Sequence, residues 1–111
     1  MDDVRAVDPA EARDLVVRGA TLLDVRDDSE WSAGRAPGAI HVVLSDLPDR
    51  VDELDRSRLV VCVCRVGGRS LRAAHFLHEE GFEVANLDGG MVAWAEGGGD
   101  LESDSQPPRI V

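Results

Sequence analysis

The residue types with the clearest chemical potential lie in one short stretch, Cys64-Arg65-Val66-Gly67-Gly68-Arg69-Ser70. This stretch follows an apolar run at 59–63, which is typical of a central strand, and precedes good helix formers at 71–80. In an open α/β sheet, ligands bind at the carboxyl ends of the strands. Backbone N–H groups of a tight glycine-containing loop can converge on an anion, and a helix N-terminus adds partial positive charge. We therefore predict an anion-binding loop at this strand end.

Cys64 is the candidate nucleophile of the predicted loop. A positive potential favours the thiolate, which lowers the pKa of a cysteine from about 8.5 and makes the sulfur nucleophilic. Many cysteines are instead inert core residues, and that interpretation suits Cys62, which lies inside the apolar run. Two residues apart on one strand, the two Cα atoms would lie about 6.5–7 Å from each other, at or beyond the usual disulfide limit. We expect two free thiols, of which Cys64 is the reactive one.

The elements that must position this loop alternate between strand-like and helix-like segments, which predicts an α/β fold on a mainly parallel sheet. Asp8 is the expected N-cap of the first helix, with Pro9 at its first position and Glu11 completing a capping box. Strands are expected at 4–7, 21–25, 40–43, 59–63 and 83–87, and helices at 9–18, 29–33, 46–54, 70–80 and around Trp94. We expect one domain at 1–98 and a flexible or loosely docked tail at 99–111.

The composition narrows the possible partners. The 111 residues carry a formal net charge of −10, which would repel nucleic acid and anionic membrane surfaces. The acidic start and the lack of a long apolar run predict a soluble cytoplasmic protein without a membrane partner. The three histidines show no spacing that would complete a zinc site with the cysteines, so neither metal nor cofactor is expected. The basic residues Arg65, Arg69 and Arg72 nevertheless fall within eight positions.

Three ordered motifs give the chain a resemblance to the rhodanese family of sulfurtransferases. Residues 64–69 look like the family's C-x-x-G-x-R active-site loop. The flanking stretches that also match are Asp24-Val25-Arg26 through Glu30-Trp31, Gly34 and Pro37-Gly38-Ala39-Ile40, and Leu87-Asp88-Gly89-Gly90 with Trp94. The resemblance implies a three-layer fold, with a five-stranded, mainly parallel sheet between helices on both faces.

The resemblance also implies a reaction and residue roles. Cys64 would take the outer sulfur of a donor such as thiosulfate as a persulfide and pass it to a thiol, cyanide or another thiophile. The loop from Arg65 through Val66, Gly67 and Gly68 to Arg69 would hold substrate through its backbone N–H groups. The Arg65 side chain would meet the incoming anion, and Arg69 would brace the loop by pairing with a carboxylate. Asp24, Arg26 and Ser70 would form a supporting shell.

Two other functions remain open at this stage. The chain could be a sulfur-carrier or persulfide-binding module that serves a partner in a sulfur relay. A cysteine-based phosphatase or arsenate reductase also places a cysteine at the start of a loop that ends in arginine. Such loops have five residues between the two, whereas four separate Cys64 from Arg69, and the smaller ring favours a terminal sulfur over a phosphate.

Overall fold

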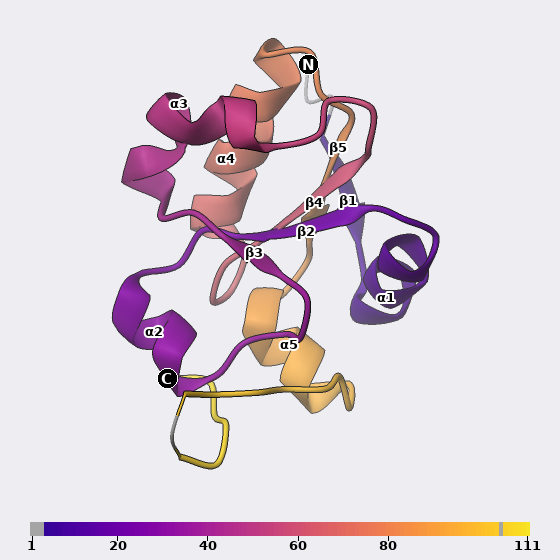
Figure 1. Ribbon diagram of the computed structural model, residues 1–111. Helices are drawn as coiled ribbons and strands as arrows, with labels where there is room; N and C mark the ends of the chain where they lie inside the picture. The colour runs from indigo at the N-terminus through magenta and orange to yellow at the C-terminus, as the bar shows by residue number, and fades with distance from the viewer. Residues whose placement is uncertain (1–3, 105) are drawn as a thin grey trace.

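A five-stranded parallel sheet forms the centre of the protein in the computed structural model, which describes residues 4–104 and 106–111. The strand order across the sheet is β1-β5-β4-β2-β3, and every described pairing is parallel (Figure 1). The strands are β1 (Arg5–Val7), β2 (Thr21–Asp24), β3 (Ile40–His41), β4 (Val60–Val63) and β5 (Val84–Leu87). The predicted α/β class and the number of strands are confirmed.

Strand β4 occupies the middle of the sheet because its residues are apolar on both faces. All four are buried, as expected of a parallel strand that is covered by helices on each side. Val60 and Cys62 point into one core cluster, while Val61 and Val63 point into the other. The next residue, Cys64, continues the first of these faces.

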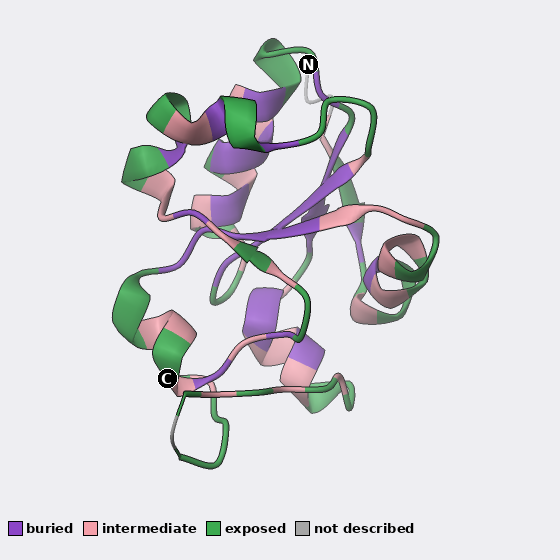
Figure 2. Ribbon diagram, viewed as in Figure 1, coloured by how far each residue is buried: buried purple, intermediate pink, exposed green. Residues whose placement is uncertain are grey.

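Helices cover both faces of the sheet (Figure 1). On one face, α3 (Leu47–Arg50) and α4 (Gly68–Glu79) pack over Val60 and Cys62. On the other, α1 (Pro9–Val17) and α5 (Gly90–Glu96) pack over Val61 and Val63. Buried residues accordingly line the inner sides of the helices and the central strands (Figure 2). The remaining helical elements are α2 (Asp28–Ala33) and the 3-10 turns η1 (Leu44–Asp46) and η2 (Val51–Glu53).

The start of α1 confirms the predicted capping box, since Asp8 Oδ1 accepts from the Glu11 N–H at 2.8 Å and the Asp8 N–H donates to Glu11 Oε1 at 3.3 Å. The single helix predicted at 46–54 is wrong. That segment consists of the end of η1, then α3, then η2, because the backbone of Arg50 leaves the helical region at φ −121° and ψ 8°.

The strand predicted at 40–43 is also shorter than expected. Its paired part ends at His41, although the Val42 N–H still donates to the Asp24 carbonyl at 3.1 Å.

The segments at 100–104 and 106–111 contact the end of α2 and the residues that follow it. Glu102 pairs with Arg35 through two backbone hydrogen bonds of 2.9 Å, and the Arg109 N–H donates to the Ala33 carbonyl at 3.0 Å. The predicted division into a domain at 1–98 and a flexible or loosely docked tail at 99–111 stays a prediction. No helix within residues 4–104 and 106–111 has the length and apolarity required to span a membrane.

Candidate active site

Cys64 lies directly after β4, where the chain turns into α4. The turn is shorter than the sequence indicates, because α4 begins at Gly68 and Ser70 already belongs to its first turn. Gly67 makes the abrupt start possible, since its φ of +123° is open to glycine but strained for other residues. Ser70 is therefore the third residue of α4, and its hydroxyl contacts the Cys64 sulfur and the Gly67 carbonyl.

The Cys64 sulfur is surrounded by hydrogen-bond donors. Its Sγ accepts from the Gly67 N–H at 3.1 Å and from the Ser70 hydroxyl at 3.3 Å. Burial by itself would raise the pKa of this thiol, and the residue is only 1% exposed. The Ser70 hydroxyl and the backbone N–H groups of the loop outweigh the burial, so the pKa of Cys64 lies below its ordinary value. The loop stabilises a thiolate.

Cys62 lies in a different environment two residues earlier. It is fully buried within β4, and burial raises the pKa of its thiol to about 12, with the neighbouring Cys64 as a smaller cause. Both cysteines are free thiols. At neutral pH Cys62 is therefore a protonated core thiol, whereas Cys64 is the thiol that the loop activates.

Two donors from different elements hold the carbonyl of Gly67, and the Ser70 hydroxyl oxygen lies close to it. The Leu71 N–H donates to it at 3.0 Å, the Ser70 hydroxyl lies at 3.2 Å, and Asn86 Nδ2 donates at 3.1 Å. Asn86 lies in β5, and its buried Oδ1 has no hydrogen-bond partner within the described residues. Asn86 was not predicted as a site residue, because its strand shows only as an apolar segment in the sequence.

Arg69 braces the loop, as expected, by pairing with a carboxylate. Its two terminal nitrogens donate to the two oxygens of Glu30 at 2.7 and 2.9 Å. The hydrogen bond from Arg69 is the main cause that holds the pKa of Glu30 at about 2, and Glu30 in turn raises the pKa of Arg69. Sequence reasoning placed Glu30 in a motif but did not identify it as the partner of Arg69.

Asp24 and Arg26 form a buried ion pair that contacts α2, the helix that carries Glu30. Arg26 Nη2 lies 2.8 Å from the Asp24 carboxylate and 2.7 Å from the Gly34 carbonyl, and both side chains are inaccessible to solvent. Arg26 Nη1 also donates to the backbone carbonyl of Glu30 at 3.4 Å. The pair therefore fixes α2, which carries the carboxylate that holds Arg69.

The start of α5 supports the loop from the opposite face of the sheet. The Met91 N–H donates to the Cys64 carbonyl at 2.8 Å, and the Val92 N–H donates to the Arg65 carbonyl at 3.1 Å. Gly90 has no room for a side chain, since an added Cβ would lie 2.4 Å from the Arg65 oxygen. The sequence contains Gly90 in a matched motif, but its contact with the loop appears only in the fold.

Arg65 and Val66 form the outer side of the loop. Both are exposed, and Val66 keeps 59% of its accessible surface. Arg65 was predicted to meet an incoming anion, and in the structure its Nε donates to the Val111 carbonyl at 3.0 Å. The fold thus gathers the predicted site residues around one strand end, with Arg65 turned towards the C-terminal segment.

Comparisons with known proteins agree with this arrangement. Residues 8–97 match the family model described as the rhodanese-like domain. The chain is 41% identical to YtwF of Bacillus subtilis over 73 residues, which cover 66% of this chain and 71% of the relative. It is 38% identical over 78 residues to a sulfurtransferase of Allochromatium vinosum, covering 69% and 73% of the two chains. A rhodanese-related protein from Thermoplasma volcanium superposes with a TM-score of 0.84 at 27% identity, over 90% of this chain and 99% of that one.

The fold and the cysteine loop define a rhodanese-like domain, and the chain belongs to this family. The relationship supports a sulfurtransferase in general terms, with a sulfur donor and a sulfur acceptor as substrates.

Proposed function

We propose that the protein is a thiosulfate sulfurtransferase in which Cys64 carries the transferred sulfur as a persulfide. The observation that carries this proposal is the pair of donors on Cys64 Sγ, the Gly67 N–H and the Ser70 hydroxyl, which favour a thiolate over a thiol. A phosphate-binding loop would need more room. Four residues separate Cys64 from Arg69, and Arg69 is already engaged by Glu30.

The first step is attack by the Cys64 thiolate on the outer sulfur of thiosulfate. The S–S bond of thiosulfate breaks, sulfite leaves with the bonding electron pair, and a Cys64 persulfide forms. The backbone N–H groups of Ser70, Gly67 and Val66 lower the pKa of Cys64, and the same groups stabilise negative charge on the sulfur, which the dipole of α4 also favours.

The second step returns the enzyme to its starting state. A thiophilic acceptor, such as cyanide or a thiolate, attacks the outer sulfur of the persulfide, and Cys64 leaves as the thiolate that the loop already stabilises. No proton transfer from a general base is required when the acceptor enters as an anion. Ser70 and the loop backbone therefore serve both steps.

Intact mass spectrometry tests this proposal directly. Incubation with thiosulfate should add the mass of one sulfur atom, and subsequent cyanide should remove it with release of thiocyanate. Cys64→Ser should abolish both events, while Cys62→Ala, a cysteine substitution two residues earlier within β4, should retain them. Catalytic turnover of thiosulfate and cyanide supports an enzyme, whereas a single loading without turnover would indicate a carrier. Hydrolysis of an aryl phosphate exceeding sulfur transfer would refute the proposal.

A further inference from the structure

The last part of the chain reaches the Cys64 loop. Arg65 directly follows Cys64, and its Nε donates to the Val111 carbonyl at 3.0 Å across 46 positions of sequence. Val111 belongs to the C-terminal strap, by which we mean residues 100–104 and 106–111, and the strap lies beside α2 (Figure 1). The strap lies outside the residues that the family model matches, so the family model does not account for this contact.

Ion pairs and a tryptophan hold the first part of the strap. Arg35 Nη2 lies 2.8 Å from Asp104 Oδ1, and Arg35 Nε lies 3.3 Å from Glu102 Oε2. Only 14% of the Arg35 side chain is exposed, so solvent screens these pairs less than it screens ordinary surface pairs. The Trp94 Nε1–H also donates to the Asp100 carbonyl at 2.9 Å. The first part of the strap is therefore fixed to the domain.

Packing holds the second part of the strap. Ile110 is partly buried against the core cluster that lies under α1 and α5. Gly34 has no room for a side chain, because an added Cβ would overlap the Arg109 carbonyl. The Gly34 carbonyl in turn accepts from Arg26 Nη2 at 2.7 Å. The end of the strap therefore rests on a residue that the buried ion pair of the site holds in place.

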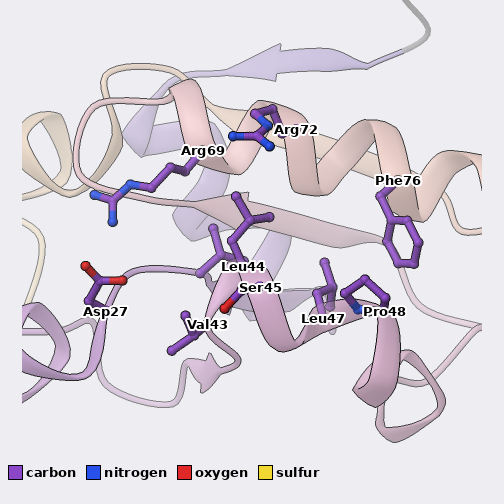
Figure 3. Close-up of a pocket in the computed structure, with 10 residues that line it drawn as sticks. Asp27, Val43, Leu44, Ser45, Leu47, Pro48, Arg69, Arg72 and Phe76 are labelled. Carbon is purple, nitrogen blue, oxygen red and sulfur yellow. The ribbon is translucent and has the colours of Figure 1, made fainter.

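The two arginines of the Cys64 loop differ in their partners. Arg69 is neutralised by its bidentate pair with Glu30, and its side chain extends towards Asp27 (Figure 3). Among the residues that the structure describes, no carboxylate pairs with Arg65, whose Nε instead meets the neutral carbonyl of Val111. Arg65 therefore carries the uncompensated positive charge of the loop, and a guanidinium is well suited to bind an anion.

The Arg65 side chain is not used at the sulfur while the strap is docked. The described donors to Cys64 Sγ are the Gly67 N–H and the Ser70 hydroxyl, and the Arg65 guanidinium is not among them. A guanidinium whose Nε is held at Val111 has to leave that carbonyl before it can close on an anion at the sulfur. The strap and an anion therefore have use for the same side chain.

We propose that the C-terminal strap competes with anionic sulfur donors for Arg65. When the strap is docked, it holds the guanidinium at Val111, and when the strap is released, the guanidinium binds the oxygen end of thiosulfate at Cys64. Because the two equilibria are linked, docking weakens anion binding by the same factor as anion binding weakens docking. The inference rests on the proposed sulfurtransferase function and adds to it a regulation by a segment outside the family domain.

Ile110→Ser tests this competition in the full chain, because it removes an apolar contact of the strap without changing the loop or any charge. The kcat/KM for thiosulfate should rise about two- to fivefold, the effect of one exposed ion pair gained by the donor. Ile40→Ser is the matched control, since it makes the same change at an exposed side chain on the edge strand β3 and should leave kcat/KM unchanged.

A second variant releases the strap through its charges. Glu102→Gln combined with Asp104→Asn removes both ion pairs of Arg35 and should change kcat/KM in the same direction as Ile110→Ser. In an Arg65→Gln background neither variant should have an effect. An unchanged or lower kcat/KM in the released variants, or an equal rise with and without Arg65, would overturn the inference.

Sulfate, an unreactive dianion, gives a readout that does not depend on catalysis. The Trp94 indole N–H and the Arg65 Nε–H both donate to carbonyls of the strap, so their NMR signals report whether the strap is docked. Sulfate should shift both signals towards their positions in Ile110→Ser, whereas sodium chloride of equal ionic strength should not. Absence of these shifts in a protein that transfers sulfur would overturn the competition alone. The shifts without sulfur transfer to any acceptor would instead refute the proposed function.

Discussion

Replacing Ser70 by alanine should raise the pKa of Cys64. The Ser70 hydroxyl has one proton and two acceptors within reach, and the Cys64 sulfur is the acceptor that receives the proton. The Ser70 oxygen lies 3.3 Å from Cys64 Sγ and 3.2 Å from the Gly67 carbonyl. That carbonyl has two lone pairs, and the Leu71 N–H and Asn86 Nδ2 already donate to it at 3.0 and 3.1 Å. The Ser70 proton is thereby left for the sulfur.

The size of the effect follows from the charge on the acceptor. A hydrogen bond to a charged group contributes about 1.5–3 kcal/mol, and a pKa change of one corresponds to about 1.36 kcal/mol, so Ser70→Ala should raise the pKa of Cys64 by about 1–2. The assay is the rate of iodoacetamide alkylation as a function of pH. Persulfide formation from thiosulfate at neutral pH should slow in parallel.

Asn86 should act on the sulfur only through Ser70. Asn86→Ala frees a lone pair of the Gly67 carbonyl, which can then take the Ser70 proton, so the pKa of Cys64 should rise by up to about 1. In a Ser70→Ala background the same change should have no further effect. An equal rise in both backgrounds would show that Asn86 influences Cys64 by another route and would refute the proton-sharing explanation.

Three further experiments have defined outcomes. The pKa of Glu30 is lowered from 4.5 to about 2. Its pair with Arg69 therefore stabilises the fold fully above about pH 4.5 and loses this effect as the pH falls towards about 2. In Glu30→Gln the free energy of unfolding, measured by denaturation, should depend less on pH across that window. Gly90→Ala should cost about 2 kcal/mol of unfolding free energy and abolish sulfur transfer, since the left-handed backbone is strained and the new Cβ would overlap the loop. The same change at Gly98, where φ is +81° and no atom lies within 4 Å of a built Cβ, should retain activity. Iodoacetamide should leave Cys62 unmodified in the native protein and label it after denaturation, as peptide mass spectrometry would show.

The features that sequence reasoning predicted well depend on contacts between near neighbours in the chain. The Asp8 capping box spans three residues, and the end of the apolar run before Cys64 marks the end of β4 within one residue. The break of the 46–54 helix at Arg50 was missed because it depends on backbone dihedral angles that no residue type there requires.

The missed parts of the site join residues that are distant in sequence. Glu30 pairs with Arg69 across 39 positions, and Asn86 reaches Gly67 across 19. Glutamate and asparagine are common, and nothing in their immediate neighbours identifies the distant residue that each of these two contacts. Only the strand order, which places β4 between β2 and β5, brings the segments that follow β2 and the side chain from β5 to the same loop.

Asn86 shows how the stability of the sheet and the reactivity of the loop compete. Its Oδ1 is buried without a partner among the described residues, and such an oxygen costs about 1–3 kcal/mol. An apolar residue at position 86, like the other residues of this strand, would avoid that cost. The other end of the same amide fixes the Gly67 carbonyl and directs the Ser70 proton to Cys64. Asn86→Leu should therefore leave the protein as stable or more stable towards denaturant while it slows persulfide formation, and this opposition of the two effects distinguishes a positioning residue from one that merely supports the fold.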